Sequence, residues 1–251
     1  MIGISSPSFS LCPLSKVAEE VAEHFKLWEI VAEAKHSLSE NKRELADLLS
    51  SYDLEIQVHA PISDVNLGSL IPEMRSVSFQ ILWSTLDACH DLGAKTVTIH
   101  PGYLSPIGFY APHKVKEACK KSLMDLDKVN RGYGLDICLE NMPSMPIMTG
   151  FSAEDIEYYL DGIDMLFCLD VGHANTVGGL SSFENLLPSL GNVHVHDNSG
   201  ERDEHLDVGD GSVDWPEVKR VLEKYNGNII IETRTIEGGL RSLENVKKML
   251  L

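Results

Sequence analysis

The segment from Met165 to His173 reads MLFCLDVGH, in which five apolar residues are followed by Asp170 and then by His173. An apolar run of this length predicts a strand that is buried on both faces of a parallel sheet. Similar short runs occur along the whole chain and alternate with longer amphipathic stretches. The predicted strands are Ile2–Ser5, Leu27–Val31, Glu55–His59, Thr96–His100, Asp136–Glu140, Met165–Leu169, Asn192–His196 and Asn228–Glu232.

The stretches between these runs have the apolar spacing of helices. In Met74–Leu92, for example, Val77, Ile81 and Thr85 recur every four residues, and Asp214 and Ser152 are suited to cap helices that follow them. Eight strands alternating with helices favour a closed (β/α)8 barrel, a TIM barrel, which would be one domain covering residues 1–251. The predicted helices are Leu14–Phe25, Ser39–Ser50, Met74–Leu92, His113–Asn130, Ala153–Leu160, Trp215–Tyr225 and Leu243–Leu250.

The composition narrows the class of protein. A formal charge of −17 over 251 residues argues against broad neutralisation of nucleic-acid phosphates, although it leaves a local basic groove or a bound metal open. The sequence contains no apolar run long enough to span a bilayer, and the amino-terminal stretch has no basic residue typical of a secretory signal. Five cysteines without a CxxC pair indicate reduced, mostly buried thiols, so we expect a cytoplasmic protein. The sequence leaves homo-oligomerisation open.

Ionisable residues close most of the predicted strands. In a parallel barrel the carboxyl ends of all strands meet at one mouth, where active sites lie. Several carboxylates gathered there would repel one another unless cations neutralised them, and histidines with carboxylates are typical metal ligands. The pattern therefore predicts a divalent-metal site. Its candidate residues are His59, His100, Glu140, Asp170, His173, His194, His196, Asp197, Asp203, His205 and Glu232.

At these positions the sequence resembles the xylose-isomerase-like TIM-barrel superfamily, which includes sugar isomerases and epimerases and also nucleases of the endonuclease IV type. The resemblance extends from His59 onward. It rests on HAP at 59–61, HPG at 100–102, LEN at 139–141, LDVGH at 169–173, HVHD at 194–197, DEHLDVGDG at 203–211 and IET at 231–233.

The isomerases and epimerases imply a single cation (Zn²⁺ or Mn²⁺, with Mg²⁺ or Co²⁺ as alternatives) and a small sugar, polyol or sugar phosphate as substrate. Glu140 and Glu232 would exchange a proton at the carbon beside the substrate carbonyl while the metal stabilises an enediolate. The other strand-end histidines would then contact the sugar or orient the ligands. The implied ligands are Glu140, Asp170, His194 and Glu232.

The nuclease branch implies three zinc ions, with Glu140 bridging two of them, and hydrolysis of a phosphodiester at abasic sites in DNA. All the matching positions carry residues of the expected type, so the ligand set alone leaves both activities open. The acidic charge and Ile62, where nucleases have an aromatic residue, favour the sugar enzyme. The implied nuclease ligands are His59, His100, Glu140, Asp170, His173, His194, Asp203, His205 and Glu232.

Three further polar residues are candidate substrate contacts. His196 is a possible substitute for His194 as a metal ligand, because both lie on the same predicted strand. We expect the two to point to opposite sides, so that only one faces the mouth, and the motif favours His194. His196, Asn141 and Glu29 are assigned to substrate binding.

Overall fold

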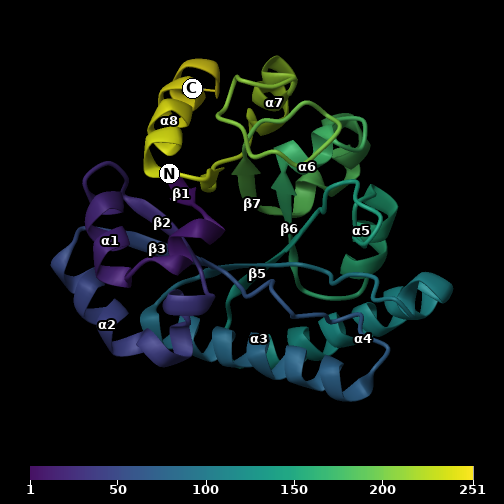
Figure 1. The fold of residues 1–251 in the computed structure, drawn as a ribbon. Coiled ribbons are helices and arrows are strands. Elements are labelled where there is room, and N and C mark those ends of the chain that lie inside the picture. Colours follow the sequence, from purple (N-terminus) through teal and green to yellow (C-terminus); the bar gives the residue numbers. More distant parts are fainter. Residues whose placement is uncertain (251) are drawn as a thin grey trace.

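The computed structural model describes residues 1–250, and within them eight parallel strands form a closed barrel, as predicted. Each strand pairs with its sequence neighbour, and the barrel closes where the first strand pairs with the last (Figure 1). The carboxyl ends of all strands therefore meet at one mouth. The strands are β1 (Ile2–Ser5), β2 (Leu27–Val31), β3 (Glu55–His59), β4 (Thr96–Ile99), β5 (Asp136–Glu140), β6 (Leu166–Asp170), β7 (Leu190–Val195) and β8 (Ile229–Glu232).

Helices surround the barrel and follow most of the predicted boundaries (Figure 1). Asp214 and Ser152 cap their helices as expected, by accepting hydrogen bonds from backbone amides three residues further along the chain. The α-helices are α1 (Leu14–Ala22), α2 (Leu38–Ser51), α3 (Pro72–Leu92), α4 (Pro112–Asn130), α5 (Ala153–Leu160), α6 (Val171–Asn175), α7 (Trp215–Leu222) and α8 (Ile236–Leu250).

Two parts of the helical layer differ from the prediction. The connection between β6 and β7 contains α6 and a 3-10 helix, Leu180–Ser189, neither of which was predicted. Helix α8 begins at Ile236, seven residues before the predicted start at Leu243, because Gly238 and Gly239 lie inside its first turns. A Cβ atom on Gly239 would lie 2.4 Å from Cδ1 of Ile4. These glycines therefore let the helix pack closely against the barrel instead of ending it.

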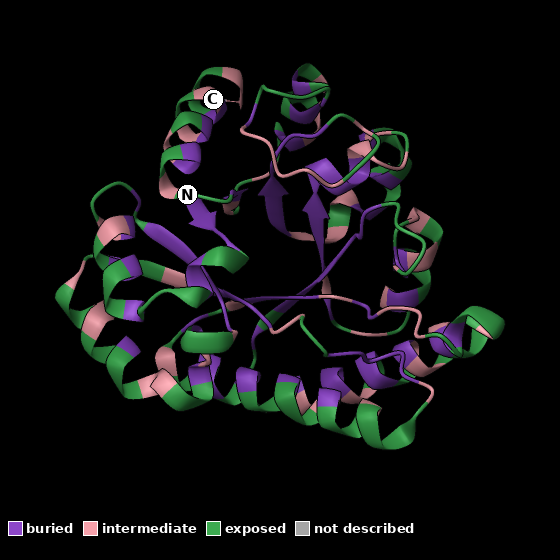
Figure 2. Cartoon of the chain, viewed as in Figure 1, coloured by how far each residue is buried: buried purple, intermediate pink, exposed green. Residues whose placement is uncertain are grey.

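Burial follows the two layers of the barrel. The strands are almost entirely buried, whereas the helices are buried on one face and exposed on the other (Figure 2). Helix α3 is an exception, since its apolar residues Val77 and Ile81 are 49% and 38% exposed. Of the five cysteines, all free, only Cys12 is exposed. None of the helices in residues 1–250 has the length and apolar character needed to cross a membrane.

Candidate metal centre

The strand-end residues converge at the mouth of the barrel, in overlapping donor groups. The potential ligand atoms within each group lie within 4.8 Å of one another. One group combines two histidines with Glu140, a second combines Glu140 with three residues from β6, β7 and β8, and a third lies beside α6. The groups are His59, His100 and Glu140; Glu140, Asp170, His194 and Glu232; and His173, His196, Asp203 and His205.

Glu140 joins the first two groups. Its Oε2 atom lies 3.2 Å from Nε2 of His59 and 3.0 Å from Nε2 of His100, while its Oε1 atom lies 3.3 Å from Nδ1 of His194. The same Nδ1 atom is also 3.1 Å from Oε1 of Glu232. A single carboxylate thus faces two separate sets of donors, and this arrangement allows it to bridge two cations.

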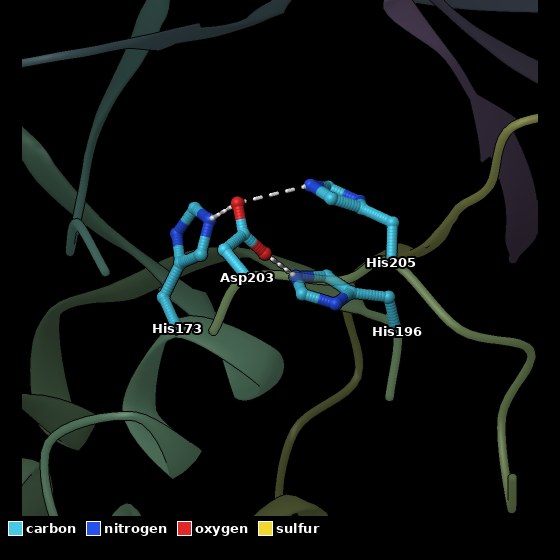
Figure 3. Close-up of side chains that lie close together, drawn as sticks. All are labelled: His173, His196, Asp203 and His205. Carbon is cyan, nitrogen blue, oxygen red and sulfur yellow. Dashed lines mark ion pairs between the residues drawn. The ribbon is translucent and has the colours of Figure 1, made fainter. Parts of the chain in front are cut away.

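The third group lies at the side of the mouth and uses a loop that follows β7. Asp203 occupies its centre: Oδ2 lies 3.4 Å from Nε2 of His173 and 3.3 Å from Nε2 of His205 (Figure 3). His205 has a positive φ of 48°, which is uncommon for a residue other than glycine. The backbone of this loop is therefore held in an unfavourable conformation at a residue that faces the donor group.

Backbone carbonyl groups fix the orientation of two ligand candidates. Nδ1 of His59 lies 2.9 Å from the carbonyl oxygen of Ala60, and Nδ1 of His173 lies 2.8 Å from that of Asn141. Because a carbonyl can only accept, each Nδ1 donates its hydrogen. In the neutral form of each imidazole, the Nε2 atom beside Glu140 or Asp203 carries the lone pair and is the atom available to a metal.

The carboxylates of the site favour the protonated forms of His59 and His173. Burial lowers the pKa of His59, but Glu140, Glu29 and Glu232 outweigh it and raise that pKa to about 9. Burial likewise lowers the pKa of His173, which Asp170 and Asp203 raise to about 10. A cation would replace these protons, since metal ligands must be deprotonated.

Unpaired buried oxygen atoms also fit a cation. Oδ2 of Asp170 and Oδ1 of Asp203 are buried and have no hydrogen-bond partner. Burying a carboxylate oxygen without a partner is costly, and a divalent cation would satisfy it. Cys168 also lies near Glu140 and His194, but burial raises its thiol pKa, which disfavours the thiolate that a metal needs.

A cavity of about 160 Å³ opens above the donor groups. Its floor contains Glu140 and Glu232, and its apolar wall includes Ile62 and the methionines at 142, 145 and 148. None of the residues lining it within the described chain is lysine or arginine. The cavity is thus suited in size and charge to a small ligand without a large negative charge of its own.

The expectation that His194 and His196 point to opposite sides is wrong. Nδ1 of His194 faces Glu140 and Glu232, while Nε2 of His196 lies 3.1 Å from Oδ1 of Asp170. The physical reason is the period of a strand: residues two apart lie on the same face, and only adjacent residues alternate. Both histidines therefore face the donor groups.

Two predicted substrate contacts lie beneath the site instead of at its opening. Glu29 is fully buried, with its carboxylate against Nε2 of His194, so it is separated from the cavity by the histidine. Asn141 is also fully buried. Its side chain donates to the backbone oxygen of Asp170 (3.0 Å) and accepts from the backbone nitrogen of the same residue (2.8 Å), which joins β5 to β6. Asn141 therefore positions Asp170.

A polar layer inside the barrel was not predicted. Gln57 and Asn192 both donate to Oε2 of Glu29, at 2.6 and 3.0 Å, and Asn192 also donates to Thr98 at 3.0 Å. The available signal was position, because Gln57, Thr98 and Asn192 each precede a strand-end histidine by two residues and so share its inward face.

Comparison with known proteins agrees with this geometry. A family model described as xylose isomerase-like TIM barrel matches residues 18–249. The protein belongs to this family. An uncharacterized protein of Methanocaldococcus jannaschii is 34% identical over 259 residues, covering 99% of this chain and 88% of its own. Proteins whose names refer to sugar epimerases and to endonuclease IV are both among those similar to this chain.

Two similar proteins of this family carry names that point to different reactions. A crystal structure of a D-tagatose 3-epimerase-like protein superposes with a TM-score of 0.92 at 32% identity, covering 99% of this chain and 96% of the other. A probable endonuclease 4 of Mycobacterium leprae is 27% identical over 200 residues, covering 75% of this chain and 76% of its own. Membership of the xylose isomerase-like family therefore leaves open whether the reaction resembles that of a sugar epimerase or that of an endonuclease.

Proposed function

We propose that the protein is a divalent-metal-dependent isomerase or epimerase of a small sugar or polyol. The observation that carries this proposal is the position of Glu140 and Glu232, which flank Nδ1 of His194 on the floor of a small cavity. Together with Asp170, these three residues would hold the cation. A divalent cation bound there acts as a Lewis acid that makes the hydrogen beside a substrate carbonyl more acidic.

Glu140 and Glu232 are assigned the proton transfers. Burial raises the pKa of each carboxyl group, but His194 and its neighbouring histidines lower it below the usual range, so both are ionised at neutral pH. One carboxylate would remove the proton from carbon and thereby become a carboxylic acid, and the other, after taking up a proton from water, would deliver that proton to carbon. Return to the same carbon from the opposite face is epimerisation, whereas return to the neighbouring carbon is isomerisation.

The cavity supports an uncharged substrate of monosaccharide size. Its volume of about 160 Å³ leaves little room for a polymer, and its lining lacks basic side chains among residues 1–250. The methionines at its opening supply an apolar surface that can adapt to a sugar ring. A small neutral sugar is therefore the favoured class over a sugar phosphate.

Exchange of substrate hydrogen with solvent tests this proposal and can be measured on many sugars in parallel. Protein loaded with Mn²⁺ or Co²⁺ would be incubated with a panel of ketoses and aldoses in D2O, and NMR would monitor the carbon-bound hydrogens. We expect deuterium at the carbon next to the carbonyl of at least one sugar and none with Glu232→Gln. Absence of exchange across the panel would contradict the proposal.

Hydrolysis of a phosphodiester is the second candidate. It is favoured by one observation, namely that Glu140 faces both the His59–His100 pair and His194, as a bridging carboxylate would. Incision of a duplex containing an abasic site, with zinc present, is the direct assay. Incision that depends on Glu140, without hydrogen exchange in any sugar, would replace the isomerase proposal with this one.

A further inference from the structure

His196 has the surroundings of a metal ligand, although the resemblance assigns it no cation. The residue is 1% exposed, and its buried Nε2 atom has no hydrogen-bond partner. That atom lies 3.5 Å from Oδ1 of Asp203 and 3.1 Å from Oδ1 of Asp170. Oδ1 of Asp170 already accepts a 2.6 Å hydrogen bond from the backbone nitrogen of His173. The Nε2 atom of His196 and Oδ1 of Asp203 are thus two unpartnered buried atoms that face each other.

The chain around His196 is shaped to hold its imidazole in this place. A Cβ atom on Gly172 would lie 2.0 Å from Cε1 of His196, so the ring occupies space that only glycine leaves open. On its other side the ring stacks on His205, with centroids 4.0 Å apart and 18° between the planes. A ring confined by a glycine and by a stacked neighbour has little freedom to turn its Nε2 atom away from the group.

The tautomer of His196 follows the pattern of the other ligand candidates. Its Nδ1 atom approaches the carbonyl oxygen of the next residue, Asp197, at 3.4 Å. His59 makes the corresponding contact with the carbonyl of Ala60. A hydrogen on Nδ1 leaves the lone pair on Nε2, directed into the group as coordination requires.

The separations within the group are short enough for four ligands of one zinc ion. Oδ2 of Asp203 lies 3.4 Å from Nε2 of His173 and 3.3 Å from Nε2 of His205, while Oδ1 lies 3.5 Å from Nε2 of His196. All four donor atoms lie within 4.8 Å of one another, and a tetrahedral site with ligands at about 2.0–2.1 Å from Zn²⁺ has separations of about 3.3 Å, so small side-chain shifts bring the group to this geometry. Figure 3 shows the three imidazoles arranged around Asp203 from different directions.

We propose that His196 is the fourth ligand of a closed zinc site formed with His173, Asp203 and His205. Four protein ligands leave no position for water or substrate, which is typical of a structural zinc ion. Asp203 and His205 belong to the loop between β7 and α7, whereas His173 belongs to α6. The ion would therefore fasten this loop, which forms one wall of the substrate cavity, to the barrel.

This inference rests on the proposed function only in that both require cations at the mouth. Its test measures metal binding and not turnover. The purified protein would be stripped with a chelator and titrated with Co²⁺, whose visible absorption is much stronger when four-coordinate than when six-coordinate. Three variants are compared with the wild type. His196→Ala removes the proposed fourth ligand, His205→Ala removes another ligand of the same group, and His113→Ala is a control on the exposed surface of α4.

We expect the wild type and His113→Ala to show the four-coordinate spectrum. His196→Ala and His205→Ala should each lose it, and each should retain one equivalent fewer of zinc after gel filtration. A spectrum changed by His205→Ala but not by His196→Ala would overturn the proposal, because it would leave the site with three protein ligands. A wild-type protein without any four-coordinate Co²⁺ would overturn it too, whether or not the variants fold.

Trypsin gives a second measurement on the wild-type protein. Arg202 is exposed and adjoins Asp203 in the fastened loop. We expect zinc to slow cleavage after Arg202 in the wild type by at least about tenfold, and to have no such effect in His196→Ala. Equal protection in both proteins would contradict a role for His196 in fastening the loop. Hydrogen exchange in the sugar panel can succeed or fail independently of either result.

Discussion

The Nε2 atom of His194 lies 3.0 Å from Oε1 of Glu29, and neither side chain is exposed to solvent. Gln57 and Asn192 hold the same carboxylate from beneath. Nδ1 of His194 meanwhile faces Glu140 and Glu232. Glu29 therefore forms a carboxylate–histidine pair below the central donor group, an arrangement that orients a metal-binding imidazole and strengthens it as a ligand.

Replacing Glu29 should weaken cation binding without removing a ligand. We expect Glu29→Gln to lower the affinity for Mn²⁺ by about 10–100-fold, because the amide no longer stabilises the imidazole of His194 as a carboxylate does. Calorimetric titration measures the change. Glu55→Gln, at an exposed position of β3, is the matched control. Equal affinities in the two variants would contradict the positioning role.

Glu232→Gln should abolish proton transfer while leaving the fold unchanged. The amide keeps the shape of the side chain but cannot accept a proton from carbon, so we expect hydrogen exchange in the sugar to fall by at least about 10²-fold. Circular dichroism should show an unchanged fold. Glu237→Gln, on the exposed surface of α8, should behave as the wild type. Retained exchange in Glu232→Gln would remove this residue from the reaction.

Chelation should reduce stability. Cations that bind only the folded state stabilise it by about 2.7 kcal/mol at a concentration 100 times the dissociation constant. We expect a chelator to lower the melting temperature and an excess of Zn²⁺ or Mn²⁺ to restore it, as monitored by calorimetry. A melting temperature that is insensitive to both treatments would argue against cation binding at the mouth.

His36 should make stability depend on pH away from the metal centre. Burial lowers its pKa from 6.5 to about 4, and Nε2 donates to the carbonyl of Cys12 while Nδ1 has no partner. Between pH 6.5 and 4, His36 is protonated in the unfolded chain but remains neutral in the folded protein. The stability contributed by the neutral ring is therefore lost as pH falls through this window, to a limit on the order of 3 kcal/mol.

Urea denaturation of His36→Gln across this range checks the prediction. The variant should lose less stability than the wild type between pH 6.5 and 4, because glutamine does not titrate. His113→Gln, at an exposed position, should follow the wild-type curve. Parallel curves for all three proteins would show that His36 does not cause the dependence.

The barrel and the convergence of its strand-end residues were predictable because both depend on local patterns. Each strand is a short apolar run, and its last residue lies at the mouth of the barrel regardless of the length or conformation of the loops. His59, Glu140, Asp170 and Glu232 could therefore be grouped before their distances were known. Their ligand roles remain a prediction, since the distances show proximity and not coordination.

The remaining features depend on packing between distant segments. The burial of Glu29 beneath His194 results from the register of β2 inside the barrel, which its own sequence does not encode. The early start of α8 depends on the fit of Gly239 against Ile4. The expected orientation of His196 was an error that the sequence alone could have corrected, because strand periodicity places His196 on the same face as His194.

The pairing of Ser5 with Glu232 has a consequence for how the protein matures. These residues are 227 positions apart in the sequence (232 minus 5), so the contact that closes the barrel spans nearly the entire chain. During synthesis the earlier strands can associate first, but the central donor group lacks Glu232 until β8 has been made and inserted. Acquisition of the metal is thereby postponed to the end of folding, and a nascent or truncated chain lacks a complete binding site.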